Sequence, residues 1–115
     1  MRIALIALAL AFGLTGCHSA FINATVSNRS GVPISLVEVD YPSASFGKDR
    51  LASGQDFHYR FKVLGSGPTT ALWTDAANHQ QKSSGPTLRE GDEGDLILTF
   101  PPHAAPTWSL HLHNR

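Results

Sequence analysis

The sequence predicts an all-β fold, an antiparallel sandwich of about seven strands. The chain beyond residue 20 has no long stretch of helical periodicity. It shows short runs in which apolar and polar residues alternate, separated by clusters of Gly, Pro, Asn and Ser. The expected domain, residues 21–115, has the size of an immunoglobulin-like sandwich, which is roughly 100 residues. A small open barrel is the alternative.

The first half of this region contains three candidate strands, which we expect over residues 21–27, 34–41 and 56–63. The apolar phase of the second strand shifts between Leu36 and Val37, which indicates a β-bulge. Residues 42–54 form the longest irregular stretch, with room for a short edge strand around Phe46. The third strand alternates apolar and polar residues throughout, as expected for an antiparallel sheet that is covered on one side.

The second half contains four further candidates, over residues 69–74, 80–84, 95–100 and 107–113. The 80–84 run is polar, so we expect it at a sheet edge. Residues 87–94 are interpreted as an acidic connector. The last strand should turn Trp108, Leu110 and Leu112 inward and leave the residues between them in solvent.

The first sixteen residues have the pattern of a signal peptide. Arg2 supplies a positive charge, and the following run, residues 3–14, is apolar apart from Gly13. This run is too short to span a bilayer core, which takes about 20 residues. It is followed by Leu14-Thr15-Gly16-Cys17.

That tetrad resembles the lipobox of bacterial lipoproteins. The resemblance implies that residues 1–16 are removed and that Cys17 carries a diacylglyceryl group and often an acylated amino group. Residues 17–20 would then be a lipidated terminus and a short tether. Cys17 is the single cysteine of the chain, and lipidation accounts for it. The residue after it is His18. In enteric lipoproteins an Asp at this position favours retention in the inner membrane. His18 therefore favours the outer membrane, facing the periplasm, in a Gram-negative organism.

The body of the chain also resembles small uncharacterised bacterial lipoproteins with an immunoglobulin-like β-sandwich. The residues that carry this resemblance are 23–33, 41–47, 59–61, 84–86 and 90–92. It implies a cell-envelope location and no assigned activity.

Histidines are the first candidate for chemistry. His111 and His113 are two residues apart on an expected strand, so they share a face, and we expect His103 to reach them around the intervening proline turn. Imidazole is a common metal ligand, and such a pair suits Zn²⁺ or Cu²⁺. The alternative is that these side chains simply occupy the solvated face of a terminal strand.

Two further clusters have competing interpretations. Glu90 to Asp95 holds four carboxylates and two glycines. Such oxygen ligands suit Ca²⁺, but the spacing is not that of an EF-hand, and we favour a solvated turn. Tyr41 and Phe46 flank the long irregular stretch. If exposed there, they would suit recognition of a protein or glycan partner; the alternative is that they pack onto the rim of the sandwich.

Composition and motifs exclude several classes of function. Nine basic and nine acidic side chains balance, which argues against binding of nucleic acid and against a polybasic membrane surface. No nucleophile elbow, metalloprotease helix or phosphate loop occurs, so we expect neither an enzyme nor a cofactor. The sequence therefore predicts a lipid-anchored envelope protein with a binding or structural β-sandwich. The alternative is a small periplasmic metal-binding protein that uses His111 and His113.

Overall fold

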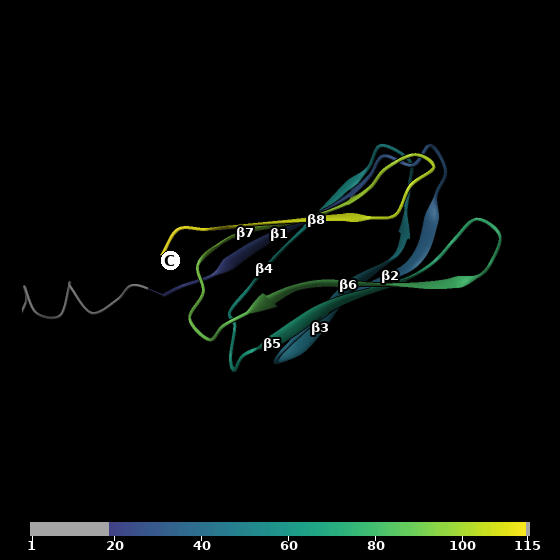
Figure 1. The fold of residues 1–115 in the computed structure, drawn as a ribbon. Helices are drawn as coiled ribbons and strands as arrows, with labels where there is room; N and C mark the ends of the chain where they lie inside the picture. The colour runs from purple at the N-terminus through teal and green to yellow at the C-terminus, as the bar shows by residue number, and fades with distance from the viewer. Residues whose placement is uncertain (1–18, 115) are drawn as a thin grey trace, which may run out of the picture.

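A computed structural model describes residues 19–114, which form two four-stranded β-sheets packed face to face (Figure 1). The predicted signal peptide, residues 1–16, and the predicted lipidation site, Cys17, lie outside the described residues. The strands are β1 (Ile22–Asn28), β2 (Ile34–Tyr41), β3 (Ala44–Leu51), β4 (Asp56–Phe61), β5 (Gly67–Thr74), β6 (Gln80–Leu88), β7 (Gly94–Phe100) and β8 (Thr107–Leu112). The predicted all-β, immunoglobulin-like sandwich is confirmed. Within residues 19–114 no helix is long and apolar enough to cross a membrane.

The strand that sequence reasoning underestimated is β3. Residues 42–54 were expected to be irregular with a short edge strand, but β3 runs for eight residues and pairs antiparallel with β2 along its length. It lies at the edge of its sheet. Only Phe46 and Leu51 within it are buried, and a mostly polar edge strand gives little apolar alternation to detect.

The first sheet has the order β4-β1-β7-β8. Its neighbours are antiparallel except β1 and β7, which run parallel. Parallel neighbours require a crossover connection, and here the chain passes through the other sheet between them. The expectation of antiparallel pairing is thus correct for the fold as a whole and wrong for this central pair.

The second sheet has the order β3-β2-β5-β6, and it contains the predicted bulge. Leu36 and Val37 of β2 together face Trp73 of β5, because the register shifts by one residue there. Leu36 adopts a left-handed backbone (φ 50°) and is 63% exposed, whereas Val37 is buried. The bulge therefore turns one of two consecutive apolar residues out of the core.

Several strand boundaries also differ from expectation, by two residues or more in β4, which ends at Phe61 and not at residue 63, in β5 and in β6. β5 begins at Gly67, and β6 continues to Leu88 through residues that were interpreted as connector. A second register shift, opposite Thr69, allows β6 to continue past Gly85. A Cβ on Gly85 would lie 2.8 Å from Cδ2 of Trp108, so glycine permits the close approach of β6 and β8.

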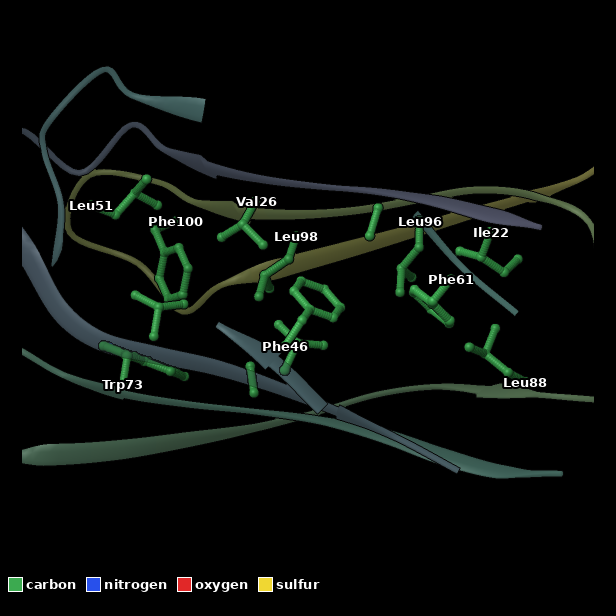
Figure 2. Close-up of a cluster of buried hydrophobic side chains, with 14 of the residues drawn as sticks. Ile22, Val26, Phe46, Leu51, Phe61, Trp73, Leu88, Leu96, Leu98 and Phe100 are labelled. Carbon is green, nitrogen blue, oxygen red and sulfur yellow. The ribbon is translucent and has the colours of Figure 1, made fainter. Parts of the chain in front are cut away.

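The core lies between the sheets and extends over their full length (Figure 2). Side chains also close both flanks of the sandwich. On one flank Trp108 Nε1 donates a hydrogen bond to Ser83 Oγ (3.0 Å). On the other, the rings of Phe46 and Tyr59 stack with their centroids 4.6 Å apart.

Strand direction divides the turns between two ends. The entry end, where the described chain begins, contains Phe21 and the turns 42–43, 62–66 and 89–93. The loop end contains the turns 29–33, 52–55, 75–79 and 101–106. β1 leads from one to the other, a rise of about 20 Å for its seven residues. Figure 1 shows the end of β8 near the start of β1 and the β7–β8 turn at the opposite end.

Candidate functional site

The histidine pair lies on the solvated face of β8, at its entry end. The rings of His111 and His113 have centroids 6.1 Å apart. His113 Nε2 lies 3.3 Å from Asp95 Oδ2, and both of these side chains are about half exposed. The shared face was predicted correctly.

His103 does not join this pair. It lies in the β7–β8 turn at the loop end, whereas His111 pairs with Asp95 near the start of β7. The expectation that His103 reaches the other two is therefore wrong, because β8 carries the chain away from the turn. Among residues 19–114, no three His, Cys, Asp or Glu side chains are arranged to hold a metal ion.

The acidic segment at residues 90–95 is a hydrogen-bonded turn leading into β7. Asp92 is buried, and its Oδ2 accepts a hydrogen bond from Arg89 N (2.8 Å). Glu90 Oε1 accepts one from Gly65 N (3.2 Å), and Glu90 N donates one to Ser66 Oγ (3.0 Å). These contacts join the turn to residues 65–66, so the predicted turn is correct, but it is not solvated throughout, because Asp92 is buried.

Tyr41 and Phe46 belong to the core and its margin. Phe46 is only 7% exposed, so of the two interpretations packing is correct and an exposed binding ring is wrong: β3 is a strand, and Phe46 occupies an inward position on it. Tyr41 is half-buried and stacks on Phe61 with centroids 3.9 Å apart. Burial raises the pKa of the Tyr41 hydroxyl, with a smaller contribution from Tyr59.

A pocket of about 280 Å³ opens at the loop end. It is formed where three turns, from distant parts of the chain, meet over the end of the core. Its lining residues are Ser30, Val32, Ile34, Trp73, Asp75, Ala76, Phe100, Pro101, His103, Ala104 and Pro106. Most of these side chains are apolar, so we refer to this feature as the loop-end pocket.

Two aromatic rings from different sheets form the floor of the loop-end pocket. Trp73 of β5 and Phe100 of β7 meet edge to face, with centroids 4.9 Å apart. Both are more than nine-tenths buried, and Figure 2 shows them together at one end of the core. Because Trp73 lies opposite the β2 bulge, the bulge helps to define the floor.

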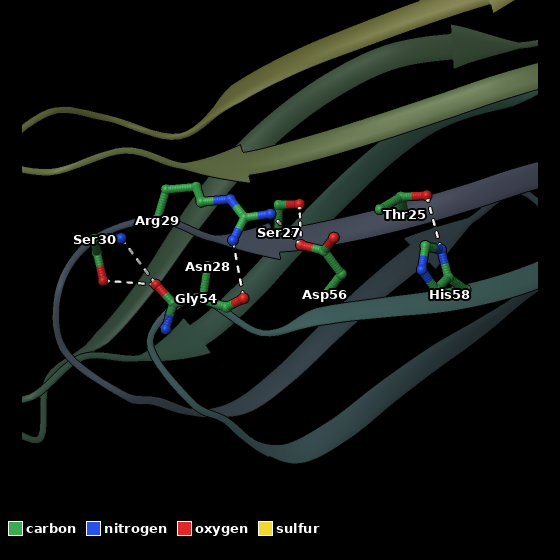
Figure 3. Close-up of polar contacts among 8 residues, drawn as sticks. All are labelled: Thr25, Ser27, Asn28, Arg29, Ser30, Gly54, Asp56 and His58. Carbon is green, nitrogen blue, oxygen red and sulfur yellow. Dashed lines mark hydrogen bonds and ion pairs between the residues drawn. The ribbon is translucent and has the colours of Figure 1, made fainter.

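Asn28, at the end of β1, holds the wall of the pocket. Its fully buried side chain donates hydrogen bonds to Val32 O (2.8 Å) and Leu51 O (3.0 Å). Its Oδ1 accepts hydrogen bonds from the backbone and the hydroxyl of Ser30 (3.1 and 2.7 Å; Figure 3). Beside it, Arg29 forms an ion pair with Asp56 (2.9 Å). The turn 29–33 is therefore fixed from inside.

Asp75 and His103 are the ionisable residues of the rim. Asp75 Oδ1 accepts hydrogen bonds from Ala77 N and His79 N, and its Oδ2 accepts one from the Gln81 amide. The bond from His79, followed by that from Gln81, lowers the pKa of Asp75 below its ordinary value of 3.8. His103 is exposed and has a left-handed backbone (φ 54°), a conformation uncommon outside glycine.

Sequence reasoning missed the two residues that define this site. Asn28 falls between two expected strands, and Trp73 falls within the strand expected over residues 69–74, where it is buried as the pattern of that strand allows. Periodicity gives no signal for a buried asparagine that anchors two turns, because its partners are 4 and 23 residues away. Periodicity also gives no signal that Trp73 lies beneath a pocket.

No family model matches the chain, and no curated protein matches its sequence. A search of solved structures finds a protein from Eubacterium rectale, determined by NMR, with a TM-score of 0.56. The match covers 82% of this chain and 91% of the other, at 7% sequence identity. At that identity the likeness supports the sandwich fold alone.

Proposed function

We propose that this protein is a lipoprotein of the bacterial cell envelope whose β-sandwich serves as a binding or structural module. The observation that carries the proposal is the order of three sequence features: a positive charge at Arg2, an apolar run, and the tetrad ending in Cys17. Together they have the pattern of a lipoprotein signal peptide. Cleavage would leave Cys17 as the first residue, lipidated on its thiol.

The start of the sandwich suits a short attachment. Phe21 O accepts a hydrogen bond from Gly94 N (3.2 Å), and the Arg60 guanidinium lies over the Phe21 ring, 3.9 Å from its centroid. The free tether is thereby limited to residues 17–20, which span at most about 14 Å. A domain attached in this way stays close to the lipid surface and presents its loop end outward.

Stable anchoring requires more than one acyl chain, because a single chain binds membranes only marginally. A diacylglyceryl group on Cys17, with or without an acylated amino group, meets that requirement. In a Gram-negative cell, His18 in place of Asp favours the outer membrane, with the domain in the periplasm. The partner would then be an envelope protein or glycan.

The test is expression of the full chain in a bacterial host fed with a palmitate analogue. The wild-type protein should incorporate the label, fractionate with membranes and begin at Cys17 by mass spectrometry. The Cys17→Ser variant should lose the label and the cleavage, because the thiol is the acylation site. His18→Asp is the matched control: it should keep the label and move toward the inner membrane. An unlabelled wild-type chain, or one cleaved elsewhere, would contradict the proposal.

A further inference from the structure

We propose that the loop-end pocket binds an aliphatic side chain of an extended polypeptide segment, whose backbone carbonyl accepts a hydrogen bond from Trp73 Nε1. This deepens the proposed function by naming the class of partner. The direction in which the pocket faces depends on the proposed lipid anchor, whereas the chemistry of the pocket does not.

The first argument is an unused donor. Trp73 is 8% exposed, yet its indole N–H has no acceptor among residues 19–114. In that same part of the chain, no side-chain nitrogen or oxygen is both sealed from solvent and unpartnered. Trp73 Nε1 therefore keeps a path to solvent, and the residue lines the loop-end pocket. Trp108, in contrast, uses its donor on Ser83. Buried tryptophans usually satisfy this N–H, and the proposal therefore assigns it to an acceptor that enters the pocket.

The second argument is that two of the three other polar side chains around the pocket, Ser30 and Asp75, already have partners; the third, His103, lies exposed at the rim. The hydroxyl of Ser30 lies 2.7 Å from Asn28 Oδ1 and 3.0 Å from Val32 O. Asp75 Oδ1 accepts a hydrogen bond from the β5–β6 turn, and its Oδ2 accepts one from Gln81 of β6. A sugar would bring several hydroxyls that these groups serve poorly, and buried polar groups without partners are costly. A group with an apolar body and one adjacent acceptor fits better, which is the chemistry of an aliphatic residue in a peptide.

The volume of the pocket fits one bound side chain. Small-molecule sites range from about 300 to 1,000 Å³, so a pocket of about 280 Å³ lies at the lower end. Aromatic-lined recesses occur in peptide-recognising domains, in which pockets for individual side chains give specificity.

Position excludes two other occupants. The described chain enters at the opposite end of β1, so the short tether does not reach the loop-end pocket. Two copies anchored in one leaflet would both direct their loop ends away from the bilayer and would not dock pocket to pocket. The occupant is therefore a segment of another protein that faces the anchored domain.

The experiment is a titration of the full chain, purified in detergent, with isotope-labelled tryptophan. The chain has two tryptophans, so NMR shows two indole N–H signals, and Trp73→Phe assigns them. The probe is N-acetyl-leucine methylamide, which should move the Trp73 signal saturably and leave the Trp108 signal in place. N-acetylglycine methylamide, which has the carbonyl without the side chain, should bind at least tenfold more weakly.

Two exposed alanines provide matched variants. Ala104 lines the pocket and Ala105 does not. Ala104→Phe should fill the recess and weaken binding of the leucine probe at least tenfold, whereas Ala105→Phe should leave it unchanged. Equal movement of both indole signals, or unaltered binding by Ala104→Phe, would overturn the proposal. Saturable binding of N-acetylglucosamine instead of the leucine probe would assign the pocket to glycans. The lipidation test is independent of all these outcomes.

Discussion

The two ends of the sandwich differ in how their turns are held and in whether they are open to solvent. At the entry end, the acidic turn is hydrogen-bonded to residues 65–66, and the Phe21 ring lies under Arg60. At the loop end, Asn28 holds the wall turns from inside while the recess above Trp73 stays open. The same two sheets thus end in hydrogen-bonded turns on one side and in an open recess on the other.

The largest expected effect concerns the loop end. Asn28→Ala removes four side-chain hydrogen bonds from a fully buried position. We expect it to lower the free energy of unfolding by about 3 kcal/mol, measured by chemical denaturation of the full chain in detergent. Asn23→Ala, at an exposed position on the same strand, should change it by less than about 0.5 kcal/mol. Equal effects of the two variants would show that the loop end does not depend on Asn28.

The next effect concerns the entry end. A Cβ on Gly94 would collide with the backbone oxygen of His111 and lie 2.8 Å from Leu112 Cα. Gly94→Ala should therefore cost about 2 kcal/mol through overpacking of β7 against β8. At Gly67 an added Cβ meets Pro42 Cγ at an ordinary 3.5 Å, so Gly67→Ala should be nearly neutral. Unlike Asn28→Ala, Gly94→Ala should leave the Trp73 indole signal in place; movement of that signal would mean that the two ends are coupled.

A smaller effect is expected where the chain enters. Arg60→Ala removes the cation–π contact with Phe21, which is worth about 0.5–1 kcal/mol at an exposed site. Hydrogen exchange at the amide of Ile22 should become faster, because the entering segment opens more often. Lys62→Ala removes a nearby positive charge without this contact. If it accelerates exchange as much, general electrostatics and not the ring contact holds the segment.

The smallest effect is a pH dependence at the loop end. Because hydrogen bonds lower the folded-state pKa of Asp75 below 3.8, its ionised form contributes stability above that value. This contribution is lost as the pH falls through the folded pKa. Asp75→Asn should therefore reduce the loss of stability below about pH 4, followed by acid denaturation. Gln81→Ala, which removes one of the three donors, should give an intermediate dependence; a steeper one would contradict the assignment.

The sequence predicted the β-sandwich because its signals are local. Alternation in β1, β4 and β7 and the shift at Leu36 are read from neighbouring residues, and the structure confirms the class and the bulge. The full length of β3 was not predictable, because an edge strand is stabilised by pairing with β2 and little by apolar contacts of its own. The parallel β1–β7 pair depends on residues about 70 positions apart, which no local pattern encodes.

The candidate site was less predictable still. The loop-end pocket is assembled from turns near residues 30, 75 and 103, and each of these reads as an ordinary turn in isolation. The predicted association of His103 with His111 failed for the converse reason: a short separation in sequence becomes a long one in space when a strand runs between the residues.

By itself, then, the sequence determined the all-β class, and it supplied the resemblance of residues 14–17 to a lipobox, since targeting patterns and strand periodicity are local properties. The tertiary structure decided which end of the sandwich became a recess and that Trp73 kept an unpaired donor beneath it. The physical reason is that both features depend on how two sheets meet, and thus on contacts between residues far apart in the chain.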